Sequence, residues 1–307
     1  MRFITSRITA LIVIVLVETA GRCDTFRVAT YNLESYLEAA TASRRAKPAE
    51  AKAKIRESIL ALKPDVLALQ ELGNVGALME LREALKNDGL DLPYWQLISA
   101  TDTNIHIAVL SKFPFAESRP HTNDSFLLNG RRFHVSRGFA EVDINLNPNY
   151  SFTLIAVHLK SRRAVTEADE AELRFEEAKI LREIIDARLE KEPDANLLVL
   201  GDFNDTKDSA SVKTVIGRGK TKLVDTRPAE GNGHKPQTSG SQLEHRLVTW
   251  THYYANEDSY RRIDFLFLTK GMAREWIPAE TYVLAMDNWG LASDHRPLVA
   301  AFEAEEK

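Results

Sequence analysis

The sequence predicts a protein of the α/β class, because apolar runs of strand length alternate with stretches of helical periodicity along most of the chain. Helices are expected at 48–62, 75–86 and 166–189. Pro64 follows the first of them, and the last begins with acidic residues, which the helix dipole favours at an N-terminus. The chain has 307 residues, which is long enough for one large domain or two small ones.

Strands are expected where short apolar runs are bounded by turn residues. In the run 133–144, apolar and polar residues alternate, which predicts a half-exposed strand with antiparallel neighbours. The runs 246–254 and 261–269 are expected to form a hairpin through the loop 255–259. The polar segment 231–241 is interpreted as a surface loop. The other expected strands are 26–33, 65–71, 94–99, 105–111, 151–158, 196–200, 281–285 and 297–302.

The N-terminal residues 1–21 have the pattern of a secretory signal peptide, with a basic start, a short apolar stretch and small residues before the cleavage point. The apolar stretch at 8–17 is too short to span a bilayer comfortably, so an uncleaved membrane anchor is the weaker alternative. We therefore expect a secreted or periplasmic protein without a stable membrane span in the mature chain. Cys23 is the only cysteine, so no disulfide is expected within the chain, and lipid attachment there is a further alternative.

Polar side chains lie at the ends of the strongly apolar strands. A carboxylate in a strand built for burial is costly unless it is paired, hydrogen-bonded or bound to a metal. Each of these residues alone is an ordinary turn residue, but together they indicate one site where strand ends converge. Carboxylate and amide oxygens suit Mg²⁺, Mn²⁺ or Ca²⁺, and no cysteine ligand set indicates zinc. The residues are Asn32, Glu34, Glu71, His158, Lys160, Asp202, Asn204, Asp264, Asp294 and His295.

Six short segments of the chain carry these residues: TYNLE at 30–34, LQE at 69–71, HLKS at 158–161, GDFND at 201–205, RIDF at 262–265 and SDHRPL at 293–298. In this order they resemble the motifs of the endonuclease/exonuclease/phosphatase (DNase I-like) superfamily. The resemblance covers nearly all of the mature chain as one domain at 25–305. It implies a four-layer α/β/β/α sandwich, in which two packed mixed β-sheets are flanked by helices and the site lies at one edge of the sheets.

The resemblance also implies a metal site for Mg²⁺, or alternatively Mn²⁺ or Ca²⁺. Glu71 is expected to bind the ion directly, together with Asn32, Asp294 and, less strongly, Glu34. A divalent ion there neutralises charge on the scissile phosphate and stabilises the leaving oxygen.

Five residues are expected to take catalytic roles under the same resemblance. Asp202 orients or deprotonates the attacking water, and Asn204 hydrogen-bonds a phosphate oxygen or the nucleophile. Asp264 holds His295, which raises the pKa of His295 and allows the imidazolium to stabilise the negative charge of the transition state. His158 is expected to donate a hydrogen bond to a phosphate oxygen.

The substrate is expected to be a phosphate ester, and a nucleic acid is the first expectation. The net charge of −4 gives no global basic field, so a nuclease must use local basic clusters, of which the chain has three, at 131–137, 160–163 and 261–262. Arg137 and, less strongly, Lys160 are the candidate phosphate contacts. The aromatic residues Trp250, Tyr253 and Tyr254 are candidates for stacking on bases or for the core.

Two alternatives to a nuclease remain open at this point. The first is a lipid or small-molecule phosphate-ester hydrolase of the sphingomyelinase or inositol-phosphatase kind. The second, from another class of function, is a non-catalytic member of the fold that binds a partner. The sequence leaves the oligomeric state open.

Overall fold

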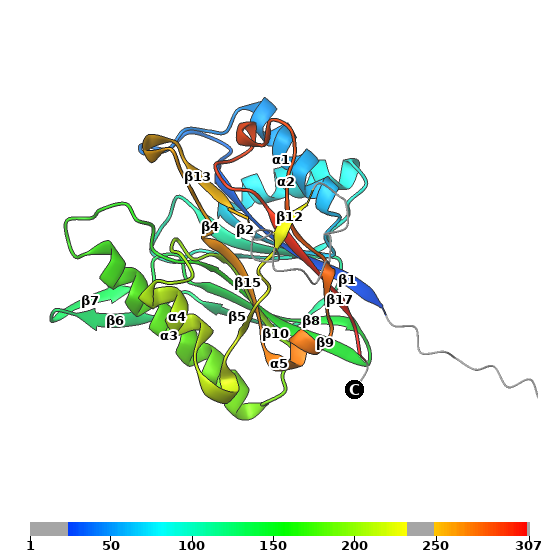
Figure 1. Ribbon diagram of the computed structural model, residues 1–307. Coiled ribbons are helices and arrows are strands. Elements are labelled where there is room, and N and C mark those ends of the chain that lie inside the picture. The colour runs from blue at the N-terminus through cyan, green and yellow to red at the C-terminus, as the bar shows by residue number, and fades with distance from the viewer. Residues whose placement is uncertain (1–23, 232–248, 306–307) are drawn as a thin grey trace, which may run out of the picture.

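Two β-sheets pack face to face and helices cover the outer face of each, which confirms the expected four-layer α/β/β/α sandwich (Figure 1). The computed structural model describes residues 24–231 and 249–305. The expected signal peptide at 1–21, Cys23 and nearly all of the loop at 231–241 lie outside the described residues. Within the described ranges, no helix is long and apolar enough to cross a membrane.

The first sheet has seven strands in the order β12-β16-β17-β1-β2-β4-β3. It is mixed, because β1 runs parallel to β2 and antiparallel to β17. Its strands are β1 (Thr25–Tyr36), β2 (Val66–Leu72), β3 (Tyr94–Ile98), β4 (His106–Ser111), β12 (Ala229–Gly231), β16 (Trp276–Leu284) and β17 (Leu298–Glu303).

The second sheet has six strands in the order β11-β15-β10-β9-β8-β5. It is mixed as well, because β10 runs parallel to β9 and antiparallel to β15. Its strands are β5 (Phe115–His121), β8 (Phe139–Asn147), β9 (Tyr150–His158), β10 (Leu197–Asp202), β11 (Val224–Asp225) and β15 (Asp264–Leu268).

Three apolar cores fill the spaces between the four layers. The helices α1 (Ala49–Leu62) and α2 (Val75–Asn87) cover the first sheet, and α3 (Glu170–Lys191) and α4 (Ala210–Ile216) cover the second. The third core lies between the two sheets and takes alternate residues of their strands. A fifth helix, α5 (Lys270–Arg274), is a short connection after β15.

The alternation of side chains along the strands carries the polar residues to the space between the sheets. In β10, Leu198 and Leu200 face the inner core, so Asp202, two residues further on, faces the same side. The same spacing leads from Ala156 to His158 in β9 and from Leu266 to Asp264 in β15. The inner core is therefore apolar along most of its length and becomes polar at one edge of the sandwich.

The strand register then brings these polar residues next to one another. Asp202 is the direct partner of His158 across the parallel pair β10–β9 and of Asp264 across the antiparallel pair β10–β15. Gly201 allows this close pairing, because its φ is +135° and an added Cβ would lie 2.1 Å from the carbonyl oxygen of Val157.

The expected hairpin of 246–254 with 261–269 is wrong. Within the described residues of these two runs and the loop between them, the hairpin is short and pairs β13 (His252–Tyr254) with β14 (Ser259–Arg261). The residues of β15 instead pair with β10 inside the second sheet. An unbroken apolar strand such as β15 is buried on both faces, so it belongs to the interior of a sheet.

The expected strand at 133–144 is also wrong in part, because it is two strands. One is β7 (Arg131–His134), which pairs with β6 (Ser125–Leu128), and the other is β8. The break falls before Gly138, whose φ is +69° and whose position leaves no room for a Cβ beside the carbonyl oxygen of His121. The antiparallel setting of β8 is confirmed, but its first residues are buried on both faces.

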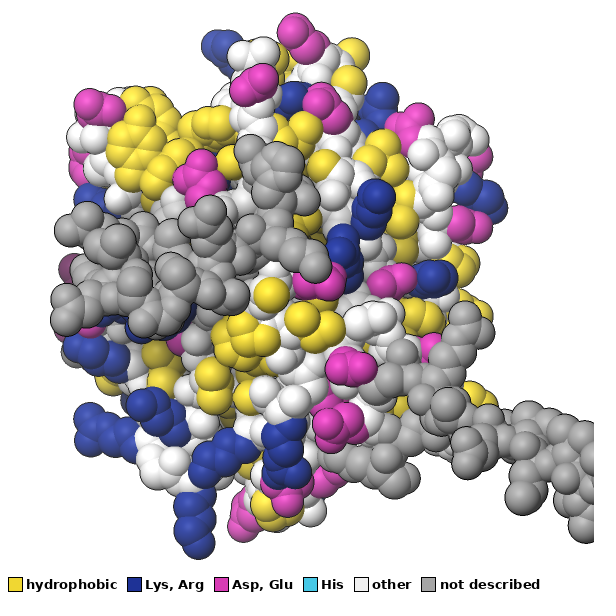
Figure 2. Space-filling view, turned by 45° about the vertical axis from the view of Figure 1, so that its right-hand side comes forward, with side chains coloured by type: hydrophobic (Ala, Val, Ile, Leu, Met, Phe, Trp, Pro, Cys, Tyr) yellow, Lys and Arg dark blue, Asp and Glu magenta, His cyan; other side chains and the backbone are white. Residues whose placement is uncertain are grey.

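The surface carries charges of both signs. Figure 2 shows one face on which acidic and basic side chains are interspersed, with Lys and Arg gathering at the lower left. This distribution agrees with the small net charge of −4. Binding of an anion therefore has to come from local groups of cations rather than from the field of the whole protein.

Candidate active site

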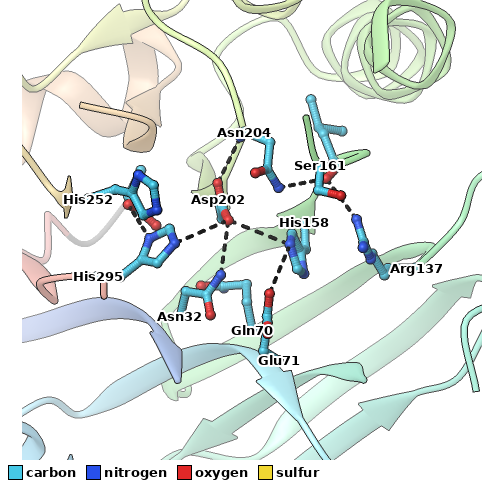
Figure 3. A network of polar contacts seen from close by, with 12 residues as sticks. Asn32, Gln70, Glu71, Arg137, His158, Ser161, Asp202, Asn204, His252 and His295 are labelled. Carbon is cyan, nitrogen blue, oxygen red and sulfur yellow. Dashed lines mark hydrogen bonds and ion pairs between the residues drawn. The ribbon is translucent and has the colours of Figure 1, made fainter. Parts of the chain in front are cut away.

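Asp202 lies at the centre of a buried polar network to which both sheets contribute (Figure 3). Its Oδ2 accepts a hydrogen bond of 2.9 Å from the side-chain amide of Asn32, which comes from the first sheet. Its Oδ1 accepts one of 2.7 Å from the backbone N–H of Asn204. The Nε2 atoms of His158 and His295 lie 3.5 Å and 3.8 Å from Oδ2. One carboxylate therefore joins groups from four of the predicted motifs, its own included.

The environment of Asp202 raises its pKa to about 6. The main cause is burial, which disfavours the charged carboxylate, and the negative charge of Asp264 adds to the effect. The positive charge of His295 and the hydrogen bonds from Asn204 and Asn32 oppose it. A carboxylate with a pKa of about 6 is ionised at neutral pH and is still basic enough to accept a proton from water.

His295 forms a buried pair with Asp264, whose Oδ2 lies 2.8 Å from Nδ1 of the imidazole. Burial disfavours the imidazolium, but the carboxylates of Asp264 and Asp202 outweigh it and raise the pKa of His295 well above its ordinary value. His295 is therefore a cation at neutral pH.

The segment that carries His295 is tied directly to the first sheet. The hydroxyl of Ser293 donates a hydrogen bond of 2.8 Å to the backbone carbonyl of Asn32. The same oxygen accepts one of 3.0 Å from the N–H of His295. This link holds the Ser-Asp-His turn in place beside Asn32.

His158 is neutral, in contrast to the cationic His295. Its side chain is buried, and its Nε2 lies 3.5 Å from Asp202 and 4.0 Å from Oε1 of Glu71. Burial, together with the positive charges of Arg137 and His295, holds the pKa of His158 well below its usual value. Figure 3 shows the two imidazoles on opposite sides of Asp202, and the pKa shifts make that of His158 neutral and that of His295 charged.

Three of the predicted residues have left-handed backbone conformations. The φ angles of Glu34, Glu71 and Asn204 are 48°, 58° and 51°. Residues other than glycine rarely adopt this region, and such strain is concentrated at functional sites. In Asn204 it turns the side chain so that the amide donates a hydrogen bond of 2.9 Å to the carbonyl of Leu159.

The carboxylates predicted to bind metal line one side of the network. Glu71, Glu34 and Asp294 all border the same hollow. Burial raises the pKa of Glu34, and the negative charges of Asp294 and Glu71 contribute, against the opposing effect of Lys47. Crowded oxygen donors of this kind fit a hard divalent ion such as Mg²⁺, which would relieve their mutual repulsion. With Asn32 beside them, Glu71 and Asp294 are the residues that would hold it.

Two cations lie on these carboxylates, and sequence reasoning missed both. Arg44 Nη1 is 2.9 Å from Oε2 of Glu71. Lys47 Nζ is 3.3 Å from Oε2 of Glu34 and donates a hydrogen bond of 2.6 Å to the carbonyl of Ala292. Both residues come from the irregular segment before α1, which has no periodicity that would have drawn attention to them.

His252 was also missed. Its ring lies 4.5 Å from that of His295, and its Nε2 is 3.5 Å from Oδ2 of Asp294. Among the described residues, two sets of three side chains have possible ligand atoms within 4.8 Å of one another: His252 with Asp294 and His295, and Asp202 with Asp264 and His295. Glu71 belongs to neither set. No motif in the sequence distinguishes His252 from any other strand histidine.

The two predicted phosphate contacts occupy different settings. Arg137 is buried, donates a hydrogen bond of 3.0 Å to the carbonyl of Leu159 and points towards the network beside His158 (Figure 3). The ammonium of Lys160 lies within 3.4 Å of the carbonyl of Ser161 and 3.2 Å of that of Arg163. Their contact with substrate stays a prediction, and so do the roles of the other site residues.

Two hollows meet at Glu34, Gly290 and Asp294. The first, of about 670 Å³, is called the basic groove here, after four cations that line it: Arg44, Arg45, Lys47 and Arg163. The second, of about 450 Å³, is called the aromatic pocket, after Tyr253, Tyr254 and Trp289. Four acidic residues, Glu34, Glu50, Glu71 and Asp294, line the basic groove as well, so its cations lie beside the candidate metal carboxylates, and the aromatic pocket adjoins them at Glu34 and Asp294.

Comparison with known protein families shows the family to which the chain belongs. The sequence profile of the Endonuclease/Exonuclease/phosphatase family matches residues 29–295, which include every predicted site residue. The chain belongs to the endonuclease/exonuclease/phosphatase family. Members of this family generally hydrolyse phosphate esters with a divalent metal. No curated protein matches the chain in sequence.

Solved structures of this family share the fold at low identity. Sphingomyelinase C from Streptomyces griseocarneus is 19% identical, with a TM-score of 0.59 over 91% of this chain and 100% of its own. Truncated Caenorhabditis elegans TDP2 is 15% identical, with a TM-score of 0.59 over 91% and 98%. The human nocturnin catalytic domain is 17% identical, with a TM-score of 0.59 over 92% and 95%. These likenesses show the fold alone.

Proposed function

We propose that the protein is a metal-dependent phosphodiesterase that hydrolyses nucleic acid. The divalent ion, held by Glu71 with Asn32 and Asp294, would supply positive charge to the scissile phosphate and the leaving oxygen. Asp202 accepts the proton of the attacking water, since it is ionised at neutral pH and lies at the centre of the network.

The imidazolium of His295, fixed by Asp264, stabilises the charge that develops on the phosphate oxygens. His158 is neutral, so its imidazole is able to donate one hydrogen bond to a phosphate oxygen. Asn204 offers a polar amide and adds no negative charge that would repel the substrate. Each group keeps the protonation state that its role requires at the same pH.

The observation that carries the choice of a nucleic acid is the meeting of the basic groove and the aromatic pocket at Glu34 and Asp294. Single strands are bound by cations that follow the backbone and by aromatic rings on which bases stack. The exposed ring of Tyr254 and the rings of Tyr253 and Trp289 offer such surfaces next to the reaction centre.

Secretion is a separate part of the proposal and rests on the signal-like pattern at 1–21. We expect the mature protein outside the cytoplasmic membrane, with an N-terminus near residue 22. N-terminal sequencing of the protein recovered from the medium or the periplasm checks this, and an intact Met1 in the membrane fraction would contradict it.

The test of the activity is a substrate panel for the mature protein with Mg²⁺ or Mn²⁺. It contains single-stranded and double-stranded DNA, RNA, sphingomyelin and phosphoinositides, and it includes Asp202→Asn as the matched variant. We expect metal-dependent cleavage of a nucleic acid by the wild type that Asp202→Asn lacks. Preferential hydrolysis of a lipid would replace the proposed substrate, and equal inactivity of both proteins on all substrates would contradict the proposed enzyme.

A further inference from the structure

The four cations of the basic groove fall into two kinds. Arg44 and Lys47 are held, because each forms an ion pair with a candidate metal carboxylate. Arg45 and Arg163 have exposed side chains, and neither guanidinium has an ion pair or hydrogen bond to another described residue. The held pair neutralises charge at the reaction centre, whereas the free pair has charge available for a ligand.

The free cations come from separate parts of the chain. Arg45 lies in the segment between β1 and α1, and Arg163 lies in the segment between β9 and α3. The fold brings both to one groove, which Glu71 and Asp294 also line. Arg45 and Arg163 therefore bring two positive charges to one approach to the candidate metal site, where Glu50 is the one acidic lining residue that likewise has no ion pair with another described residue.

A substrate with a single phosphate does not need these arginines, because its phosphate is taken by the reaction centre. A zwitterionic head group would in addition bring its ammonium towards them. A nucleic-acid strand has a further phosphate at each nucleotide, and arginine binds phosphate oxygens through two parallel hydrogen bonds. The chemistry of the groove therefore matches a polyanion that continues beyond the scissile bond.

We propose that Arg45 and Arg163 form a subsite for a backbone phosphate adjacent to the scissile phosphate of a nucleic-acid strand. The inference rests on the proposed function for its substrate class, but binding tests it without catalysis. The subsite would fix the register of the strand, so that one phosphodiester bond lies over Asp202 and His295 while a neighbouring phosphate lies in the groove.

The test measures the Kd of a fluorescent single-stranded oligonucleotide by anisotropy in EDTA, over a series of salt concentrations. The double variant Arg45→Gln/Arg163→Gln is compared with the wild type and with Arg218→Gln. Arg218 is an exposed arginine far along the second sheet from the site. It lines a hollow together with Val224, and Val224 pairs with Leu268, the residue at the opposite end of β15 from Asp264. It loses a positive charge by the same substitution, away from the groove.

We expect the double variant to raise Kd at least about tenfold and to reduce the slope of log Kd against log salt by about 0.7, since the subsite neutralises one phosphate and each neutralised phosphate on a single strand contributes about 0.7. Arg218→Gln should change neither value by more than about twofold. In the presence of Mn²⁺, the ratio of kcat/KM for the oligonucleotide to that for bis(p-nitrophenyl) phosphate should fall by the same tenfold factor.

Three outcomes would overturn the subsite. The first is that the wild type does not bind the oligonucleotide, and the second is an unchanged Kd and salt slope in the double variant. The third is an equal loss of affinity in Arg218→Gln, which would indicate a diffuse effect of charge. Failure of the proposed function gives a different result, because the wild type would then bind the oligonucleotide and not cleave it with metal. A tenfold loss for polyphosphorylated inositides, with none for oligonucleotides, would move the subsite to another substrate and also overturn the inference.

Discussion

At the scale of single residues, the shifted pKa values of Asp202 and His295 predict how activity depends on pH. Asp202 has to be ionised, and its pKa is raised to about 6, so activity falls as the pH drops through about 6. His295 has to be protonated, and its pKa is raised well above 6.5, so activity falls as the pH rises through that higher value. We expect a bell-shaped profile of kcat/KM that is highest between these limits. Activity that rises steadily from pH 6 to 10 would contradict the cationic role of His295.

Asp264→Asn is the sharpest single substitution, because it keeps the shape of the side chain and removes the charge that supports His295. The loss of the Asp264 charge should lower kcat by about 10²-fold or more. It should also lower the pKa of His295, which moves the alkaline limb of the pH profile to lower pH. Steady-state kinetics over the pH range measures both effects. A lower kcat with an unmoved alkaline limb would show that Asp264 acts only on the structure.

The contrast between predicted and missed residues has a physical reason at this scale. Asp202 and Asp264 were found because a carboxylate on an apolar strand is costly to bury, so the sequence itself indicates a partner. Arg44, Lys47 and His252 have no such signal. An arginine in a polar loop is ordinary until the fold places it 2.9 Å from Glu71.

At the scale of elements, the close approach of β10 to β9 predicts that Gly201 is needed for stability. Gly201→Ala should cost about 3 kcal/mol or more of unfolding free energy, because the added Cβ meets the carbonyl of Val157 and the backbone is left-handed. Gly89→Ala is the matched control, since φ is +94° there but nothing lies within 4 Å of the Cβ, and it should cost about 1 kcal/mol. Urea unfolding followed by circular dichroism compares the two, and equal losses would contradict the steric argument.

The hairpin of β13 and β14 predicts a contribution of the aromatic pocket to binding. Tyr254→Ala should weaken the binding free energy for a single-stranded oligonucleotide by about 1–3 kcal/mol, which raises Kd by about 5- to 150-fold. The control is Tyr94→Ala, an equally exposed tyrosine on β3, where its partner Ser111 lies at the end of the sheet away from Glu71. The same loss in both variants would indicate that the pocket has no specific role.

Particular elements show how far the sequence determines the structure. The apolar runs of β10 and β9 were enough to predict that Asp202 and His158 lie at the ends of their strands. The partner of a strand is a different question, and the 261–269 run was paired with the wrong neighbour because only the packing of the second sheet selects β10. The strand β5 was missed because it is largely polar. Its Arg119 forms ion pairs with Glu141 and Asp143 of β8, and a pattern within one segment does not show such partners.

At the scale of the whole molecule, a metal that binds only the folded protein should stabilise it. Mn²⁺ or Mg²⁺ at about 100 times its Kd adds about 2.7 kcal/mol to the unfolding free energy, which raises Tm by several degrees. Glu71→Gln should remove most of this shift, because Glu71 is the principal predicted ligand. Differential scanning fluorimetry with and without EDTA measures it, and Glu80→Gln on the outer surface is the control. An equal shift in Glu71→Gln and wild type would contradict the assignment of the site.

The central claim is that groups from both sheets form one metal-dependent site that cleaves phosphodiester bonds in nucleic acid. It is tested most directly by the initial rate of cleavage of a labelled single-stranded oligonucleotide by the mature wild type and Asp202→Asn, each with Mn²⁺ and with EDTA. The account predicts cleavage only by the wild type with metal, at a rate at least about 10³-fold above the variant. Equal rates for the two proteins, or a wild-type rate unaffected by EDTA, would contradict it.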